Sequence, residues 1–373
     1  MRFHDAPIEN SGHLLIDVSR IFPLFHLDEN DSRNYRFAQT DDYLSPLQGR
    51  DIDIDFRLGE TIDHSGNGRL IGVPEDLEKW ARICRNIIGH YKNGEMDGMY
   101  LNITRVTVWE EPDNTKLFGG TVEDYSMMFC KLYQALKSDF PTLEVGGPTM
   151  MSGKDDYLKD FLRICRDNGV TPDYISSTVY ADTTSKFNNW LLRYRDATDS
   201  DGLPNIKHRV AEWHLGPTSW DPFSPDGYSA FYRAENAAFS CEALIKFMDL
   251  DFVDTVYYYA WTTSVWSVMS LRPVGGLKPG PVYYGLLFFQ KLATECVKRL
   301  DATWECGDGI TCLAGVTGEN RLRLLASCLR EDTCKLLRQV KGAKTCSLRA
   351  VTEDFNETAA LEPHPPSGKR RHF

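Results

Sequence analysis

Hydrophobic and polar residues alternate in two repeating ways along the stretch from about residue 50 to residue 290. Short runs rich in β-branched and aromatic residues are followed by longer stretches with apolar residues three or four positions apart, which is typical of strands followed by amphipathic helices. Such alternation is typical of a parallel sheet covered by crossover helices. The pattern therefore predicts an α/β fold with strands at 52–58, 99–108, 143–147, 174–180, 208–213 and 255–261.

Helices are predicted in the gaps between these strands, and two of them carry start signals. Pro74 and Glu75 open a helix at 76–91, because proline is tolerated in the first turn. Thr121 and Asp124 form a capping-box-like start for a helix at 125–137. Further helical patterns cover residues 156–168, 230–248 and 283–291.

The number of strands indicates a (β/α)8 TIM barrel that lacks its first strand. A segment at residues 1–4 supplies a seventh strand. The one strand still missing from a barrel of eight should precede residue 1, unless the barrel closes in an unusual way. An alternative is that the chain is a fragment with no function of its own. Its two exposed strand edges would then favour aggregation, and we expect poor solubility.

The character of the chain changes after residue 293. Short alternating segments at 310–316, 321–327 and 345–351, separated by Gly, Asp and Asn, predict antiparallel strands. We therefore expect a barrel domain at 1–293, a partial β-sandwich-like appendage at 294–362 and a disordered tail at 363–373.

The length, composition and net charge of the chain limit the kinds of molecule that it is expected to bind. The chain has 373 residues, 42% of them hydrophobic, which is enough for one barrel of about 250 residues and an appendage. The net charge of -11 argues against nucleic acid and anionic membranes, because no basic stripe is present to neutralise phosphates. Residues 1–30 show no signal-peptide pattern and no apolar run is long enough to span a membrane, so we expect a cytoplasmic protein. The sequence is compatible with an oligomer as well as with a monomer.

Ten cysteines are present, but their positions do not suggest a disulfide framework or a zinc site. Six lie in the last quarter without CxxC spacing, so no structural metal is expected. The other four fall within helical patterns, where a free thiol packs as a small hydrophobe: Cys84, Cys130, Cys165 and Cys241.

Two glutamates carry the candidate chemistry. Glu111 and Glu212 each follow a β-like run, each beside a tryptophan, in residues 103–112 and 209–217. They lie 101 residues apart, which corresponds to about three strand-plus-helix repeats and so to the mouth of one barrel. A retaining glycosidase needs such a pair, one carboxyl to protonate the leaving oxygen and one to attack the anomeric carbon. The alternative for each glutamate alone is a solvated carboxylate in a loop.

Several motifs resemble those of glycoside hydrolase family 39 over roughly residues 1–295. The stretch VTVWEEPDN, with a later VGGPTM, resembles the W-N-E-P-D acid/base strand of that family and its V-G-G-P. The stretch RVAEWH resembles its T-E-W-N nucleophile strand. Three further segments resemble other strands of the family in the same order: MRFH, PDYISSTVYA and YYYAWTTSVW.

This resemblance implies roles for five residues. Glu111 would be the general acid/base and Glu212 the nucleophile, while Tyr180 orients the nucleophile, Trp261 forms the floor under the sugar and His4 reaches a ring hydroxyl. It implies hydrolysis of a terminal β-linked sugar with retention, with no metal or organic cofactor. A β-xyloside is the first expectation, because the family's bacterial members mostly resemble xylosidases, although the motifs do not separate xylose from glucose.

Two positions depart from the family pattern. Glu110 stands where the family has an asparagine that holds the sugar 2-hydroxyl, and Thr178 stands where it has a histidine. Losing hydrogen bonds to the 2-hydroxyl costs on the order of a hundredfold in rate. Strand alternation points Glu110 away from the site, whereas a bulge at the strand end would point it inward. His214 contacts the ligand or is a polar loop residue.

Four further tryptophans have two possible roles, either as stacking walls for a sugar or as packed core: Trp109, Trp213, Trp220 and Trp266. Two other functions also stay open. The departures at Glu110 and Thr178 suit a catalytically impaired sugar-binding or sensing module on the same fold. A uronidase would need a basic residue near the C5 carboxylate of its sugar.

Overall fold

The computed structural model describes residues 1–3, 15–61, 71–151, 155–216, 233–261, 269–271, 277–300, 310–328, 346–352 and 355–361. Its residues fall into two compact units. The first comprises residues 1–180, 189–213 and 251–258, and the second the remaining residues. The predicted domain boundary at residue 293 stays a prediction.

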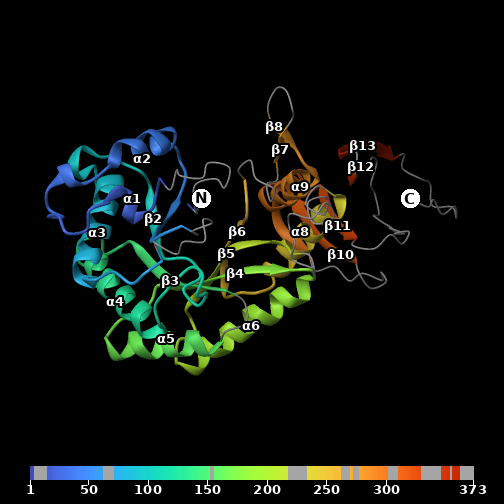
Figure 1. The fold of residues 1–373 in the computed structure, drawn as a ribbon. Helices are drawn as coiled ribbons and strands as arrows, with labels where there is room; N and C mark the ends of the chain where they lie inside the picture. The colour runs from blue at the N-terminus through green and yellow to red at the C-terminus, as the bar shows by residue number, and fades with distance from the viewer. Residues whose placement is uncertain are drawn as a thin grey trace. The chain divides into compact units, whose positions relative to one another are not determined.

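A six-stranded parallel sheet with the order β1 to β6 forms the centre of the first unit (Figure 1). The strand order follows the chain, as in a barrel built of successive strand and helix pairs. Arg2 adds a short parallel bridge to Asp55 at the β1 edge, so residues 1–3 extend the sheet. The strands are β1 (Ile54–Leu58), β2 (Ile103–Val108), β3 (Glu144–Met151), β4 (Tyr174–Ala181), β5 (Lys207–Leu215) and β6 (Val253–Tyr258).

The α/β fold class and all six predicted strands are confirmed, with corrected ends. Strand β2 begins four residues later than predicted, and β3 continues four residues further. The predicted sixth strand ends too late, because β6 stops at Tyr258 and leaves Trp261 outside it.

Helices cover the outer side of this sheet, with α3, α4 and α5 beside one another (Figure 1). Helix α6 lies in a gap between predicted strands where a helix is expected, although no range is predicted for it. Short helices precede β1: α1 (Val18–Ile21), η2 (Ser32–Asn34), α2 (Phe37–Leu44) and η3 (Ser45–Leu47). The longer helices are α3 (Leu77–Asn93), α4 (Val122–Asp139), α5 (Asp155–Asp167) and α6 (Thr184–Ser200). A short helix, η4 (Glu95–Asp97), follows α3.

Capping residues set the first turns of two predicted helices, α3 and α4. The Asp76 carboxylate accepts a hydrogen bond from the Lys79 amide at 2.9 Å, so α3 begins just after Pro74 and Glu75. Thr121 and Asp124 form the predicted capping box at the start of α4. The apolar faces of these helices pack on the sheet through fully buried side chains such as Ile83, Ile87, Met128, Phe129 and Phe161.

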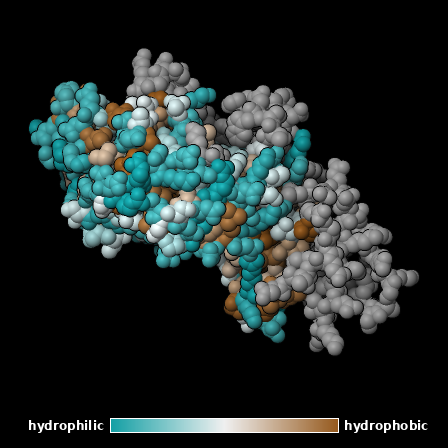
Figure 2. Space-filling view, turned by 90° about the horizontal axis from the view of Figure 1, so that it is seen from below, coloured by the Kyte–Doolittle hydropathy of each residue, from teal (hydrophilic) through white to brown (hydrophobic). Residues whose placement is uncertain are grey.

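The outward faces of these helices are polar. Figure 2 views the molecule from the side of α4, α5 and α6, and most of the coloured surface is hydrophilic there. On α5, Arg163 pairs with Asp160 and Asp167 at helical spacing. No helix in the part of the chain that the structure describes is long and apolar enough to cross a membrane.

The described part of the second unit includes the helices α8 (Ala234–Phe247) and α9 (Pro281–Glu295) and small antiparallel sheets. These helices pack with a sheet of order β11-β10-β9 around a small apolar core. The predicted antiparallel C-terminal strands are therefore confirmed. The strands are β7 (Met269–Leu271), β8 (Leu277–Pro279), β9 (Cys296–Leu300), β10 (Ile310–Thr317), β11 (Leu322–Cys328), β12 (Cys346–Thr352) and β13 (Phe355–Leu361).

A buried polar cluster holds the end of β1 against α1. Asp17 accepts hydrogen bonds from Arg57 at 2.7 Å and from the Thr61 amide at 2.9 Å. The Glu60 carboxylate accepts two hydrogen bonds from Ser19. Burial, together with the charge of Asp17, raises the pKa of Glu60 above its ordinary value of 4.5.

This cluster predicts a pH dependence of stability. Because folded Glu60 holds its proton to higher pH than unfolded Glu60, the folded state binds more protons above the ordinary pKa, and stability falls as the pH rises. We expect the free energy of unfolding of Glu60→Gln to fall less than that of the wild type between about pH 5 and about pH 8. Urea unfolding across that range measures this, and parallel curves for the two proteins would contradict it.

Candidate active site

Glu212 is held on β5 by two side chains from other strands. The Arg2 Nη1 donates a hydrogen bond to Glu212 Oε1 at 3.1 Å, and the Tyr180 hydroxyl donates one to Oε2. The Glu212 side chain is 6% exposed. A guanidinium and a hydroxyl that both bond to a carboxylate stabilise its ionised form. Glu212 is therefore an oriented carboxylate, and its contacts favour the charged form.

Arg2 is shared between two carboxylates. Its Nη2 also donates a hydrogen bond to Glu110 Oε2, and its side chain is 3% exposed. The backbone bridge of Arg2 to Asp55 fixes it at the edge of β1. Burial by itself lowers the pKa of Arg2, but the charges of Glu110, Glu212 and Asp55 outweigh burial and raise that pKa. Arg2 is thus a permanent cation between two acids.

The turn after β2 sets the directions of Glu110 and Glu111. Trp109 and Glu111 both have left-handed backbone conformations, with φ of 63° and 39°, which residues other than glycine rarely adopt. The buried Trp109 ring packs on Gly59, where an added Cβ would lie 2.8 Å from the ring. The indole Nε1 donates a hydrogen bond to the Leu117 carbonyl at 2.9 Å. This packing holds the turn and ends strand alternation at Trp109.

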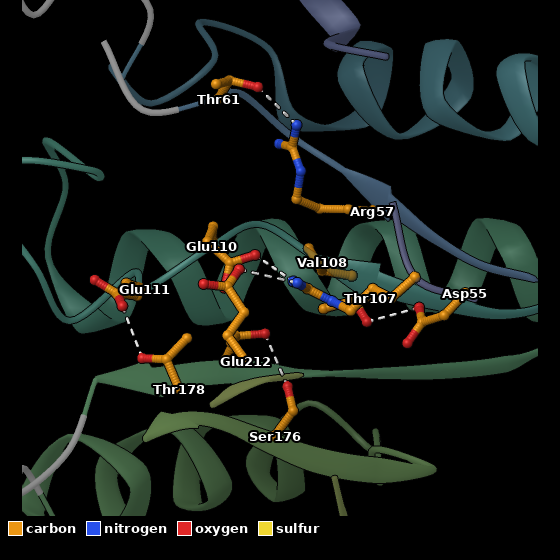
Figure 3. Close-up of polar contacts among 12 residues, drawn as sticks. Asp55, Arg57, Thr61, Thr107, Val108, Glu110, Glu111, Ser176, Thr178 and Glu212 are labelled. Carbon is orange, nitrogen blue, oxygen red and sulfur yellow. Dashed lines mark hydrogen bonds and ion pairs between the residues drawn. The ribbon is translucent and has the colours of Figure 1, made fainter. Parts of the chain in front are cut away.

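Glu110 consequently points inward. Figure 3 shows the Glu110 and Glu212 carboxylates side by side, with Glu111 turned toward Thr178. Of the two orientations that the sequence leaves open for Glu110, the structure has the inward one, with the residue 3% exposed.

Glu111 has a different set of partners. Its Oε1 accepts a hydrogen bond from the Thr178 hydroxyl at 2.7 Å, and its Oε2 accepts one from the Asn114 amide at 3.1 Å. Both donors are neutral, whereas Glu212 receives a bond from a cation. Among the contacts of the described residues, Glu111 thus accepts bonds from a hydroxyl and an amide, and Glu212 from a guanidinium and a hydroxyl.

We expect Thr178→Val to lower kcat/KM by roughly tenfold, because Glu111 then loses one oriented hydrogen bond, about 1.4 kcal/mol. Steady-state kinetics of the two proteins on one nitrophenyl β-glycoside, the substrate class that the sequence resemblance implies, measure the loss. Thr178→Ser is the matched control, since serine retains the hydroxyl, and its kcat/KM should stay near that of the wild type. An equal loss in both variants would show that the hydroxyl bond to Glu111 is not what is lost, since serine keeps the hydroxyl.

The other predicted site residues are placed as follows. His4 lies outside the described residues. His214 and Trp261 belong to the second unit. His214 is buried, its Nδ1 lies 2.7 Å from the Leu215 carbonyl oxygen, and burial lowers its pKa to about 4, so the ring is neutral. Trp261 is 56% exposed and packs edge-to-face on Tyr283. Roles of these three residues in sugar binding stay predictions.

Two tryptophans near the glutamates belong to the core. Trp109 and Trp213 are each 1% exposed, and they pack against the rings of Phe118 and Tyr258, respectively. Trp220 and Trp266 lie outside the described residues.

Sequence reasoning missed two polar residues of the site. Arg2 belongs to the MRFH segment, whose histidine alone is predicted to contact the ligand, although a charged residue in a barrel strand is itself a signal. Asn114 follows Glu111 by three residues, and its backbone amide bonds to the Glu111 carbonyl at 2.9 Å in the same turn. Across the ranges described above, no group of three or more His, Cys, Asp or Glu residues forms a candidate metal site.

Comparison with known proteins adds the family context. The family model for glycosyl hydrolases family 39 matches residues 12–268. A β-xylosidase of Geobacillus stearothermophilus is 24% identical in an alignment of 257 positions that covers 61% of this chain and 48% of the relative. The chain thus spans about half the length of this curated relative.

Solved structures show the same fold. A glucosidase from Croceicoccus marinus superposes with a TM-score of 0.66 at 22% identity, over 87% of this chain and 66% of that one. A family 39 β-xylosidase from Caulobacter crescentus has a TM-score of 0.59 at 16% identity, over 85% of this chain and 70% of its own. These likenesses support the (β/α)8 class of the parallel sheet.

Proposed function

Because this chain belongs to glycosyl hydrolases family 39, we propose that it is a retaining glycosidase that hydrolyses terminal β-linked sugars, with a β-xyloside as the first substrate to test. In this proposal Glu212 is the nucleophile and Glu111 the general acid/base. Its partner is a carbohydrate, and the proposed chemistry needs only carboxyl groups and water.

The observation that carries the proposal is the difference between the environments of the two glutamates. The nucleophile of a retaining glycosidase has to be ionised. Glu212 suits this role because it forms an ion pair with Arg2. The acid/base has to exchange a proton in each half-reaction, and Glu111 is held by the neutral donors Thr178 and Asn114. Tyr180 fixes the second oxygen of Glu212 and so orients it for attack.

Hydrolysis of nitrophenyl β-xyloside, β-glucoside, β-galactoside and β-glucuronide tests the activity and names the sugar. Proton NMR of the first product formed tests the mechanism, because retention gives the β-anomer before mutarotation mixes the two. An α-anomer as first product would overturn the retaining mechanism. Folded protein with no turnover, stabilised by a sugar against heat, would instead favour the sugar-binding module.

A further inference from the structure

Glu110 has one carboxylate oxygen to which none of the described residues is hydrogen-bonded. Its Oε2 is bonded to Arg2, whereas its Oε1 is buried and has no hydrogen-bond partner among the residues that the structure describes. The Glu110 side chain is 4% exposed. A buried acceptor without a partner costs free energy, so Glu110 Oε1 is a place where a ligand donor would be stabilised.

The position of Glu110 indicates which part of a sugar would meet it. Glu110 and Glu212 are bonded to the two terminal nitrogens of one guanidinium, so their carboxylates are neighbours (Figure 3). In the proposed function Glu212 lies against the anomeric carbon, and we expect its neighbour Glu110 to face a group next to that carbon. The ring oxygen carries no hydrogen and repels a carboxylate. The substituent on C2 is the flanking group that can donate a hydrogen bond to Glu110.

The charge of this cluster favours a cation at that position. Glu110 and Glu212 carry two negative charges against the single positive charge of Arg2. Asp55 adds a further carboxylate close enough to raise the pKa of Arg2. A hydroxyl on C2 would donate one hydrogen bond but leave the excess charge, whereas an ammonium group would donate to Oε1 and also neutralise it.

We propose that Glu110 selects glycosides with a protonated amino group at C2, that is, 2-amino-2-deoxy-β-glycosides, over their 2-hydroxy and 2-acetamido counterparts. This proposal rests on the proposed glycosidase function. Acetylation removes the charge and places a carbonyl acceptor near a carboxylate, so the N-acetyl sugar is the poorest of the three. Glu110 is then a specificity-determining residue beside the nucleophile.

The test compares kcat/KM of the full chain on nitrophenyl β-glucosaminide, β-glucoside and N-acetyl-β-glucosaminide, at a pH where the amine is protonated. We expect at least about a tenfold preference for the glucosaminide over the glucoside, since charge-assisted hydrogen bonds are about twice as strong as neutral ones. The preference should decrease as the pH rises through the pKa of the substrate amine.

Glu110→Gln removes the charge with little change of shape, and we expect it to abolish the preference for the amino sugar. Glu60→Gln is the matched control, because it removes a buried carboxylate outside this cluster and should keep the preference. Equal use of the amino and hydroxy sugars by the wild type would overturn the proposal without any variant. An unchanged preference in a folded Glu110→Gln protein would overturn it as well.

Binding separates this proposal from the glycosidase function. If no glycoside is hydrolysed, the proposed function fails, and selection is then read from the melting temperature with free glucosamine or glucose. A larger increase with glucosamine in the wild type, absent in Glu110→Gln, would support selection by Glu110. Equal increases, or none with either sugar, would overturn it.

Discussion

Alanine in place of Glu212 is expected to lower kcat by roughly a thousandfold or more on every glycoside that the wild type hydrolyses, about 4 kcal/mol of barrier. In the proposed retaining mechanism no glycosyl-enzyme forms without this carboxylate. Arg2 and Tyr180 also lose the group to which they donate hydrogen bonds. Steady-state release of nitrophenolate measures the loss. The melting temperature of the variant shows whether the protein is still folded.

Glu111→Ala provides the comparison that assigns the two roles. Nitrophenolate leaves without protonation, so loss of the acid should reduce cleavage of nitrophenyl glycosides far less than cleavage of alkyl glycosides or disaccharides. Loss of the nucleophile should affect both kinds of substrate alike. If Glu111→Ala lost activity equally on both, or if Glu212→Ala retained activity, the proposed assignment would be wrong.

The sheet was predictable because its signals are local. Each strand carries its own run of β-branched and aromatic residues, and helices α3 and α4 begin at caps that can be identified from single residues, Asp76 and Thr121. The bounds of helix α6 were not predicted, although its residues Phe187, Leu191, Tyr194 and Thr198 have helical spacing and are buried. Its two adjacent asparagines and aromatic residues weaken the helical propensity of the segment.

The site was predictable only in part, because its geometry depends on contacts between distant segments. The two catalytic candidates follow recognisable strands, but the direction of Glu110 depends on the left-handed turn at Trp109. That turn is held by packing on Gly59, fifty residues earlier in the chain. Strand alternation alone carries no information on such a contact. The link from Arg2 to Glu212 spans 210 residues and likewise has no local signal.

Arg2→Met is expected to reduce the free energy of unfolding by about 3 to 5 kcal/mol, because it leaves two buried carboxylates without their shared cation. Urea unfolding near neutral pH measures this loss. Arg2→Lys is a useful comparison, since lysine keeps the charge but lacks the two-pronged geometry that serves both acids at once. We expect its stability to fall between those of the wild type and the methionine variant.

The pH dependence of Arg2→Met separates the loss of charge from the loss of packing. In this variant the folded state gains protons on Glu110 and Glu212 more readily than the unfolded state, so its stability relative to the wild type should recover as the pH falls. The double variant Arg2→Met with Glu110→Gln removes one of the unpaired charges and should regain part of the lost stability even at neutral pH. A loss that is the same at every pH and unaffected by Glu110→Gln would mean that Arg2 acts through packing alone. The shared ion pair would then not be what holds Glu212 in place.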